Sequence, residues 1–271
     1  PRHSRNAMEP RIKPRILKGF RDVLPTEAML RRETERALET TLRSYGFHPI
    51  DTPVLEYSEI LLGKGGGETD KQVYRFHDHG DRDVAMRFDL TVPFARFMAT
   101  YEAELAFPFK RYHIAKVWRG ENTQRGRYRE FMQCDFDIVG IDHKGADTEI
   151  LLMMCRAIEK LGVENFKIHF AHRGLFNAFL DRIGGSENSV AILRIVDKLA
   201  KIGGDKVAEL LGEFLGDDKV DSVLAYISRE NTFESTLEKL VAYCGGESEA
   251  TERLRSIYAS LESLGIASRV I

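Results

Sequence analysis

The sequence predicts an α+β fold, in which an antiparallel β-sheet is flanked by helices and followed by an all-helical subdomain. Three observations lead to this prediction. Segments in which apolar and polar residues alternate, as they do in strands, recur among helical segments up to about residue 171. From residue 173 five helical segments follow one another, and no strand pattern returns before residues 268–271. The chain has 271 residues, 43% hydrophobic and 30% charged, which is enough to build a core.

Composition excludes several classes of protein. The sequence has no run of about 18 apolar residues, and residues 1–7 lack the apolar stretch of a signal peptide. We therefore expect a cytoplasmic protein with no membrane partner, and we interpret residues 1–7 as a cloning remnant. The three cysteines lie far apart and show no metal-ligand spacing, which argues against a disulfide framework or a structural metal site.

The first elements are predicted to be a helix and an irregular strand. Pro25-Thr26 followed by helix formers up to Tyr45 predicts a helix, with Thr26 as its N-cap and Gly46 beyond its C-terminus. Residues 47–55 have an extended pattern with two prolines, which cannot donate hydrogen bonds to a neighbouring strand. Such a strand belongs at a sheet edge or at an interface.

A β-hairpin and further elements are predicted next. Two extended segments, 73–77 and 83–89, flank a turn, and in the second Arg87 and Asp89 lie opposite the apolar positions. Thr91 is predicted to cap the helix that follows. The remaining predictions are strands at 109–119, 130–139 and 166–171, and helices at 91–105, 147–161, 173–183, 187–201, 205–228, 233–244 and 247–263.

Positive charge is concentrated between residues 110 and 130. Seven basic residues stand there against two acidic ones, in a chain whose net charge is −2. This concentration predicts an anionic ligand, although a charge run can also be a solvated loop. The basic residues are Lys110, Arg111, Lys116, Arg119, Arg125, Arg127 and Arg129, and the acidic residues are Glu121 and Glu130.

The predicted strand 130–139 has two unlike faces. Its even positions from Met132 to Ile138 are apolar, whereas its odd positions carry an aromatic ring, an amide and two carboxylates, which suits the lining of a cavity. The odd positions are Phe131, Gln133, Asp135 and Asp137.

Asp89 and Asp137 allow two interpretations. The sheet could bring the polar faces of the two strands together into one pocket. Alternatively, each carboxylate could belong to an internal ion pair, with Arg87 or Arg111 as the partner.

These residues resemble a known family. Arg119-Gly120-Glu121, the loop to Arg129 and the run Glu-Phe-Met-Gln-Cys-Asp-Phe-Asp-Ile-Val-Gly at 130–140 resemble motif 2 of class II aminoacyl-tRNA synthetases, in the form found in histidyl-tRNA synthetases. Gly-Phe-Arg-Asp-Val-Leu-Pro at 19–25, a motif 1-like helix and strand, and Arg-Phe-Asp-Leu-Thr at 87–91 support it. The resemblance extends from about residue 18 to the end and implies a class II synthetase-type antiparallel sheet.

The resemblance implies roles for ten residues. As the catalytic residue, Arg119 would grip the α-phosphate of ATP and the carboxylate of histidine, because a guanidinium can bond two oxygens at once. Phe131 would stack on adenine, and Glu121 and Arg127 would also contact ATP, with Arg125 and Arg127 near its outer phosphates or the tRNA acceptor end. The residues implied for histidine binding are Asp89, Leu90, Thr91, Arg119, Gln133 and Asp137, the last accepting from the imidazole N–H.

The resemblance also implies partners and domains. The substrates would be ATP with Mg²⁺, L-histidine and tRNA(His), and a homodimer would form through helix 26–45 and strand 47–55. Residues 8–171 would be the catalytic core, 172–264 a helical insertion domain, and 265–271 the start of the return to the core. The glycine-rich residues 65–69 would form a mobile loop over the site.

Several segments of that family are missing from this sequence. They are a second histidine-binding segment, a motif 3 arginine and a C-terminal anticodon-binding domain. We therefore expect a fragment of a histidine–tRNA ligase that cannot aminoacylate tRNA alone.

Two other functions stay open from the sequence. One is the non-catalytic paralogue that regulates ATP phosphoribosyltransferase in histidine biosynthesis, and the intact Arg-x-Glu and Cys-Asp-Phe-Asp runs argue against it. The other is an ATP- or RNA-binding module without turnover.

Overall fold

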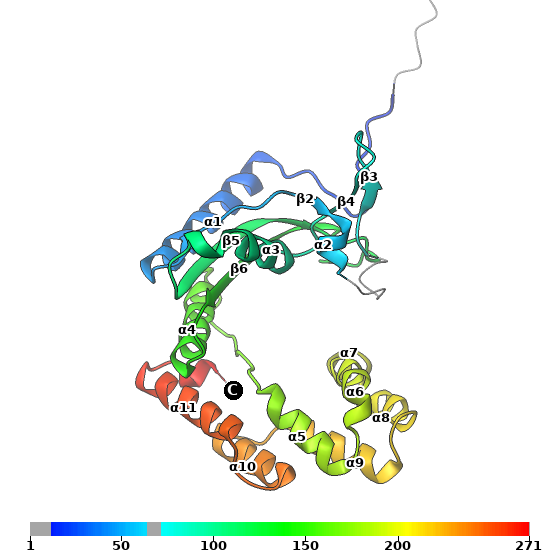
Figure 1. The fold of residues 1–271 in the computed structure, drawn as a ribbon, viewed down its shortest axis with the longest axis vertical. Coiled ribbons are helices and arrows are strands. Elements are labelled where there is room, and N and C mark those ends of the chain that lie inside the picture. Colours follow the sequence, from blue (N-terminus) through cyan, green and yellow to red (C-terminus); the bar gives the residue numbers. More distant parts are fainter. Residues whose placement is uncertain (1–11, 64–71, 271) are drawn as a thin grey trace, which may run out of the picture. The chain divides into compact units, whose positions relative to one another are not determined.

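The computed structural model describes residues 12–63 and 72–270, which form two compact units that meet in sequence at Ile141 and Asp142. Figure 1 traces both units. The predicted cloning remnant and the glycine-rich loop at 65–69 lie outside the described residues.

The first unit is built on two three-stranded sheets. Among the described residues of this unit, all strand pairs are antiparallel except β1 with β5, which confirms the predicted α+β class. One sheet has the order β1 (His48–Pro49), β5 (Phe109–Trp118) and β6 (Glu130–Val139), and the other has the order β2 (Leu55–Tyr57), β4 (Asp83–Met86) and β3 (Arg75–His77).

The β5–β6 hairpin is the longest pairing, and its two faces pack against different helices. Its register runs without a slip from Phe109 opposite Val139 to Trp118 opposite Glu130. The even face of β6 lies toward α1 (Pro25–Ser44), since the α1 carboxylate of Glu39 is close enough to affect Cys134. The odd face lies toward α3 (Thr91–Tyr101), as shown by a contact between Arg111 and Phe94.

A buried arginine joins the two sheets. The Arg87 side chain is 4% exposed and donates to the carbonyl oxygens of Thr52 at 2.6 Å and Lys116 at 3.0 Å. The Trp118 N–H also donates to the Arg87 carbonyl oxygen at 3.0 Å. The sequence predicted that Arg87 lies on a polar face that could line a pocket. In the structure its side chain donates to backbone carbonyl oxygens, so its role here is structural.

Three predicted details at element ends are wrong. Thr26 is not the N-cap of α1, because Pro25 takes the first helical position and Leu24 precedes it without a side-chain cap. Thr91 is not the cap of α3 either, because the carboxylate of Asp89 accepts from the Val92 N–H at 3.1 Å. The predicted strand 47–55 is not one strand, because His48–Pro49 pair with β5 whereas Leu55 begins β2, and Pro53, which has no N–H donor, lies between them.

The second unit is helical. Ile168 and Val270 form an isolated parallel bridge, which is what remains of the predicted strands at 166–171 and 268–271. The predicted helix 205–228 is two helices, separated near Gly216. The helices are α4 (Lys144–Lys160), α5 (Arg173–Ile183), α6 (Ser189–Val196), α7 (Leu199–Ile202), α8 (Gly204–Gly212), α9 (Asp217–Ile227), α10 (Phe233–Cys244) and α11 (Glu249–Ser263).

Three hydrophobic clusters of described residues lie in this unit. One is formed by α5, α6, α8 and α9 around residues such as Phe179 and Leu211, and another joins α4 to α11 around Cys155 and Leu261. The third joins α5, α10 and α11 through Leu175, Leu237 and Leu254. Helix α4 packs against α11 within the second compact unit, and the predicted bounds of the catalytic core, 8–171, stay a prediction. None of the helices that the structure describes is long and apolar enough to cross a membrane.

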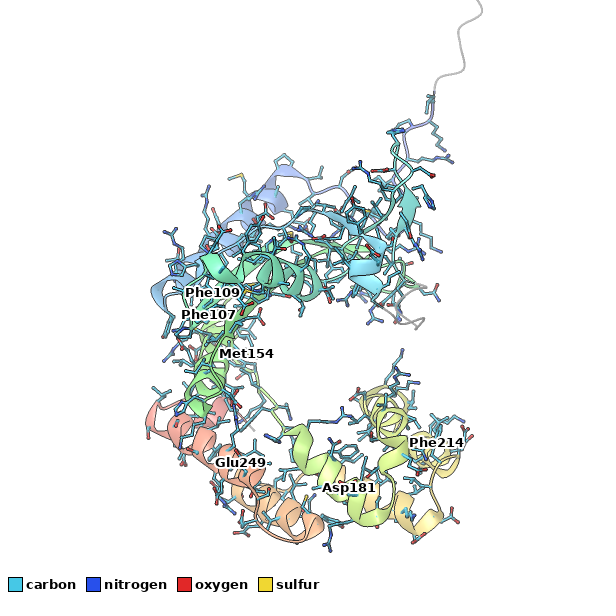
Figure 2. The ribbon with its side chains drawn as sticks, in the orientation of Figure 1. Phe107, Phe109, Met154, Asp181, Phe214 and Glu249 are labelled. Carbon is cyan, nitrogen blue, oxygen red and sulfur yellow. The ribbon has the colours of Figure 1, made fainter. Side chains whose placement is uncertain are left out.

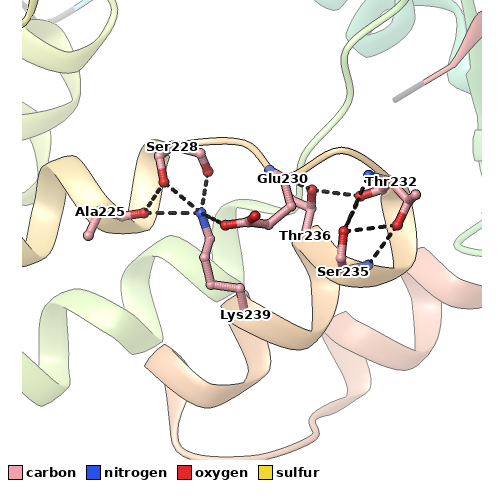
Figure 3. Close-up of polar contacts among 7 residues, drawn as sticks. All are labelled: Ala225, Ser228, Glu230, Thr232, Ser235, Thr236 and Lys239. Carbon is pink, nitrogen blue, oxygen red and sulfur yellow. Dashed lines mark hydrogen bonds and ion pairs between the residues drawn. The ribbon is translucent and has the colours of Figure 1, made fainter.

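Lys239 fixes the loop between α9 and α10 (Figure 3). Its ammonium group donates to the carbonyl oxygens of Ala225, at 3.0 Å, and Ser228, and to the Ser228 hydroxyl at 2.9 Å. The Glu230 carboxylate lies 3.7 Å away. Thr232 then begins α10 with a capping box, its side chain and that of Ser235 each bonding the other's backbone.

Glycine is needed where the β5–β6 hairpin ends. Gly140 has a φ of +87°, and a Cβ there would lie 2.4 Å from the Phe107 ring. Phe107 is labelled with Phe109 at the start of β5 in Figure 2. A larger residue at 140 would displace this ring or strain the backbone.

Candidate active site

The register of the β5–β6 hairpin gathers polar side chains on one face. Asp137 lies opposite Arg111, Asp135 opposite His113, and Gln133 opposite Ala115. Directly opposed residues of an antiparallel pair project from the same face of the sheet. The predicted odd face of β6 is thus confirmed, and β5 adds a cation and an imidazole to it.

The segment before α3 brings further polar groups to this face. Burial raises the pKa of the Asp135 carboxyl above 3.8, and the nearby carboxylates of Asp137 and Asp89 raise it further. Arg111 and a hydrogen bond to Thr91 oppose that rise. Asp89, Thr91, Asp135 and Asp137, which are distant in sequence, are therefore neighbours.

Leu90, predicted among the histidine-binding residues, has a different environment from the residues on either side of it. Its side chain is fully buried in the core. Leu90 as a whole residue has no exposed surface, so it presents neither side chain nor backbone to a ligand in this structure.

Arg119 and Phe131 form the other end of the candidate site. The Arg119 guanidinium lies 5.1 Å from the centroid of the Phe131 ring, and its Nε donates to the Phe88 carbonyl oxygen at 3.0 Å. No hydrogen bond joins its two terminal nitrogens to another residue that the structure describes. The terminal nitrogens are the ones that can form a fork onto two anionic oxygens.

The loop between β5 and β6 carries the other predicted ATP contacts. Glu121 and Arg127 form an ion pair at 3.1 Å, with Arg127 58% exposed. Gln124 and Arg127 close the loop through a backbone bridge. These two charges neutralise each other in the structure, so the phosphates of ATP would have to compete with Glu121 for Arg127.

An N-terminal glycine anchors the base of this loop. The Arg129 N–H donates to the Gly19 carbonyl oxygen at 2.8 Å, and its Nε donates to the Glu121 carbonyl oxygen at 3.0 Å. Gly19 has a φ of +88°, and a Cβ there would lie 2.7 Å from the Arg129 side chain. The Gly-Phe-Arg-Asp run at 19–22 thus supports the hairpin loop structurally.

Arg111 forms an internal ion pair with Asp137. Its Nη2 contacts the Oδ2 atom of Asp137, so the ion-pair interpretation is correct for Asp137, with Arg111 and not Arg87 as partner. The Arg111 side chain is fully buried, whereas that of Asp137 is 40% exposed. The carboxylate can therefore hold Arg111 on one side and meet a ligand on the other.

One further polar group of this face, His113, escaped the sequence interpretation, whereas Gln133 was predicted. His113 is 3% exposed, with Nε2 at 3.1 Å from Asp51 Oδ1, and burial lowers its pKa below 6.5, helped by the positive charge of Arg87. The Gln133 Oε1 atom is buried and accepts no hydrogen bond from a described residue. The alternation of β5, where Arg111 and His113 share one face, was the available sign of these partners.

Other parts of the described chain offer weaker candidates. Residues 12–63 and 72–270 contain no cluster of three or more His, Cys, Asp or Glu arranged to hold a metal ion. A cavity of about 500 Å³ lies in the second unit, lined mostly by apolar side chains of α5, α9 and α10. It contains none of the site residues predicted from the sequence.

Comparisons with known proteins identify the family of this chain. The family model described as Histidyl-tRNA synthetase matches residues 19–271. A protein of Treponema denticola named Histidine--tRNA ligase is 54% identical over 96% of this chain and 59% of its own length, and one of Rhodopirellula baltica with the same name is 44% identical over 94% and 59%. The chain thus spans about 59% of the length of these relatives.

Solved structures share the fold. The crystal structure of a histidyl-tRNA synthetase from Nostoc sp. PCC 7120 has a TM-score of 0.82 and 26% identity, and covers 96% of this chain and 61% of its own. A Bacillus halodurans structure, titled as an ATP phosphoribosyltransferase regulatory subunit/histidyl-tRNA synthetase, has a TM-score of 0.77 and 23% identity, with 95% and 68% covered, so it supports the fold alone. From the family match and these relatives, the chain belongs to the histidyl-tRNA synthetase family.

Proposed function

We propose that this chain is the adenylation part of a histidine–tRNA ligase. In this proposal the protein activates L-histidine with ATP and transfers the histidyl group to tRNA(His). The observation that carries the proposal is the order of groups along one face of the β5–β6 hairpin. An arginine beside an aromatic ring lies at one end, and neighbouring carboxylates with an amide lie toward the other.

The Arg119 end suits ATP. An aromatic ring offers a face on which a purine can stack, and a guanidinium binds phosphate oxygens. Phe131 and Arg119 lie close enough to act on one nucleotide. Glu121 and Arg127 would assist from the loop once their ion pair opens. Mg²⁺ enters the proposal as part of the substrate, bound to the phosphates of ATP.

The carboxylate end suits the amino acid. Asp89, Thr91 and Gln133 would bind the α-ammonium group, which needs acceptors, and the buried Gln133 Oε1 lacks a donor among the described residues. Asp137 would accept from the imidazole N–H.

Activation needs little covalent chemistry from the protein. The carboxylate of histidine attacks the α-phosphorus of ATP, and the bond to the leaving pyrophosphate breaks. Because the nucleophile is already charged, no general base is required, and catalysis rests on positioning and on stabilising charge at the phosphorus. Arg119 is the one residue placed to bind both reacting groups in this proposal.

Replacing Arg119 tests the assignment. We expect Arg119→Ala in the full-length gene product to lower histidine-dependent ATP–pyrophosphate exchange by about a hundredfold or more, the effect of removing an oxyanion donor. Arg82→Ala is the matched control, because Arg82 lies in an exposed turn and pairs with Asp78. Near-normal exchange by the Arg119→Ala protein would contradict the assignment.

The regulatory function is not favoured, because the relatives reported above at 44% and 54% identity are named ligases. Exchange measurements separate the two functions directly. A regulator of ATP phosphoribosyltransferase should show no histidine-dependent exchange, whereas a ligase should.

We also propose that the protein works as a homodimer in the cytoplasm. Helix α1 and the segment before it expose apolar side chains, including Leu24 at 73%, Met29 at 65% and Leu30 at 63%. Exposed apolar clusters of this kind are typical of interaction surfaces. Light scattering of the full-length protein should give twice the monomer mass, and Met29→Glu should lower it; a monomeric parent protein would contradict the dimer.

A further inference from the structure

A buried cation lies beneath the proposed amino-acid end of the site. The Arg111 side chain has no exposed surface, and its guanidinium carbon lies 4.0 Å from the centroid of the Phe94 ring. Phe94 belongs to α3, so Arg111 is enclosed between that helix and the sheet. An arginine is seldom fully buried unless a specific charge requires it there.

The guanidinium is only partly satisfied. Nη2 contacts Asp137 Oδ2, but Nε, Nη1 and Nη2 form no hydrogen bond of good geometry with the described residues. Burial lowers the pKa of Arg111, and the carboxylates of Asp137, Asp135 and Asp89 oppose that shift. Unfilled donors on a buried charge reduce stability, so folding alone does not explain this arrangement.

Asp137 connects this cation to the solvent-accessible side of the face. Its Oδ2 is held by Arg111, while its Oδ1 has no hydrogen-bond partner among the residues that the structure describes. A carboxylate fixed through one oxygen presents the other in a set direction. Such an oxygen can accept from an imidazole N–H.

We propose that Arg111 is a positioning residue for the amino-acid side chain, which fixes the orientation of the Asp137 carboxylate that recognises the imidazole. The inference rests on the proposed function and adds a residue to it. The positive charge of Arg111 also lets Asp89, Asp135 and Asp137 share one small region. Arg111 would not touch the substrate itself.

An apolar replacement of similar length isolates this role. Arg111→Met removes the charge and the forked donors but keeps much of the volume against Phe94. Because Asp137 is 40% exposed, water can solvate its charge when Arg111 is absent, so the fold should survive. Thermal unfolding of the variant checks this directly.

The experiment measures histidine binding to the full-length protein by isothermal titration calorimetry, together with the KM values for histidine and ATP in the exchange reaction. We expect Arg111→Met to weaken histidine binding by about tenfold, the scale of one charge-assisted hydrogen bond, while KM for ATP changes by less than about twofold. Lys110→Met is not a suitable control, because Lys110 bonds the Tyr45 carbonyl oxygen; exposed Arg82→Met serves instead.

A double-variant cycle then tests whether Arg111 acts through Asp137. If it does, Arg111→Met added to Asp137→Asn should weaken binding by less than about twofold beyond Asp137→Asn alone, since coupled residues are not additive.

Three results would overturn the inference. They are unchanged histidine affinity in folded Arg111→Met, an equal loss of ATP affinity, or full additivity with Asp137→Asn. If Arg111→Met does not fold, Arg111→Lys decides, because it keeps the charge but not the fork; parental histidine affinity in that variant would contradict the proposal. If the parent protein shows no exchange, the proposed function is contradicted instead. The calorimetric comparison of the parent protein with Arg111→Met would still decide the role of Arg111.

Discussion

Arg111 in the first unit and Lys239 in the second are both enclosed cations, but their surroundings differ. Lys239 has its donors aimed at backbone carbonyls and a hydroxyl that the fold fixes in place. Arg111 contacts a half-exposed carboxylate and leaves its nitrogens without well-formed hydrogen bonds to described residues. The comparison shows that burial of a charge does not by itself indicate function. The partners decide whether the charge serves the fold or a ligand.

The largest effect on stability is expected from Lys239. We expect Lys239→Met to lower the free energy of unfolding by about 2–3 kcal/mol, because it removes charged hydrogen bonds that join the end of α9 to α10. Arg111→Met should change it by less than about 1 kcal/mol, since water can reach Asp137. Urea unfolding measures both.

Lys206→Met is the matched control for Lys239. Lys206 pairs with Glu209 in an exposed setting, with side chains 51% and 65% exposed, so it should have little effect. If Arg111→Met destabilised the protein as much as Lys239→Met, the distinction between the two cations would fail.

A smaller effect is expected from His113, which borders Arg111 on the same face. Burial lowers its pKa, so the folded protein keeps it neutral while the unfolded chain binds a proton below pH 6.5. The stability that this neutral histidine contributes is therefore present above pH 6.5 and is lost as pH falls. His113→Gln should lose less stability than the parent between pH 6.5 and 5 in urea unfolding. An identical pH slope in both proteins would contradict a depressed pKa.

The smallest effect is expected from Asp135. Its raised pKa means that the ionised form destabilises the folded state, and this cost is absent below the ordinary value of 3.8 and grows as pH rises through the folded pKa. Asp135→Asn should therefore increase the urea midpoint more at pH 7 than at pH 4. The same shift at both pH values would indicate that Arg111 and Thr91 already offset the cost.

The sequence predicted the most regular elements well. The bounds of β6 at 130–139, α5 at 173–183 and α10 at 233–244 are as predicted, because strict alternation marks the strand and glycines follow the two helices at Gly184 and Gly245. The prediction of a single strand at 47–55 was wrong because the local sequence pattern does not show which of these residues will have a pairing partner. The prediction of a single helix at 205–228 was wrong because the break near Gly216 is short, and its sequence pattern does not differ from that of a continuous helix.

Part of the candidate site could be predicted from the sequence, because only part of it depends on local geometry. Period-two alternation identified the odd face of β6, which depends only on local geometry. The neighbourhood of Asp89 and Asp135 depends on contacts between distant segments, which no local pattern reports. The same limit hid the difference between Arg87, which is bound to backbone, and Arg111, which is bound to Asp137.

The account as a whole rests on the claim that the β5–β6 face binds histidine beside ATP. ATP–pyrophosphate exchange by the full-length gene product, measured with each of the common amino acids in turn, tests it most directly. The account predicts exchange that depends on histidine and that Asp137→Asn weakens through KM for histidine. Exchange with another amino acid in preference to histidine, or no exchange with any, would contradict it.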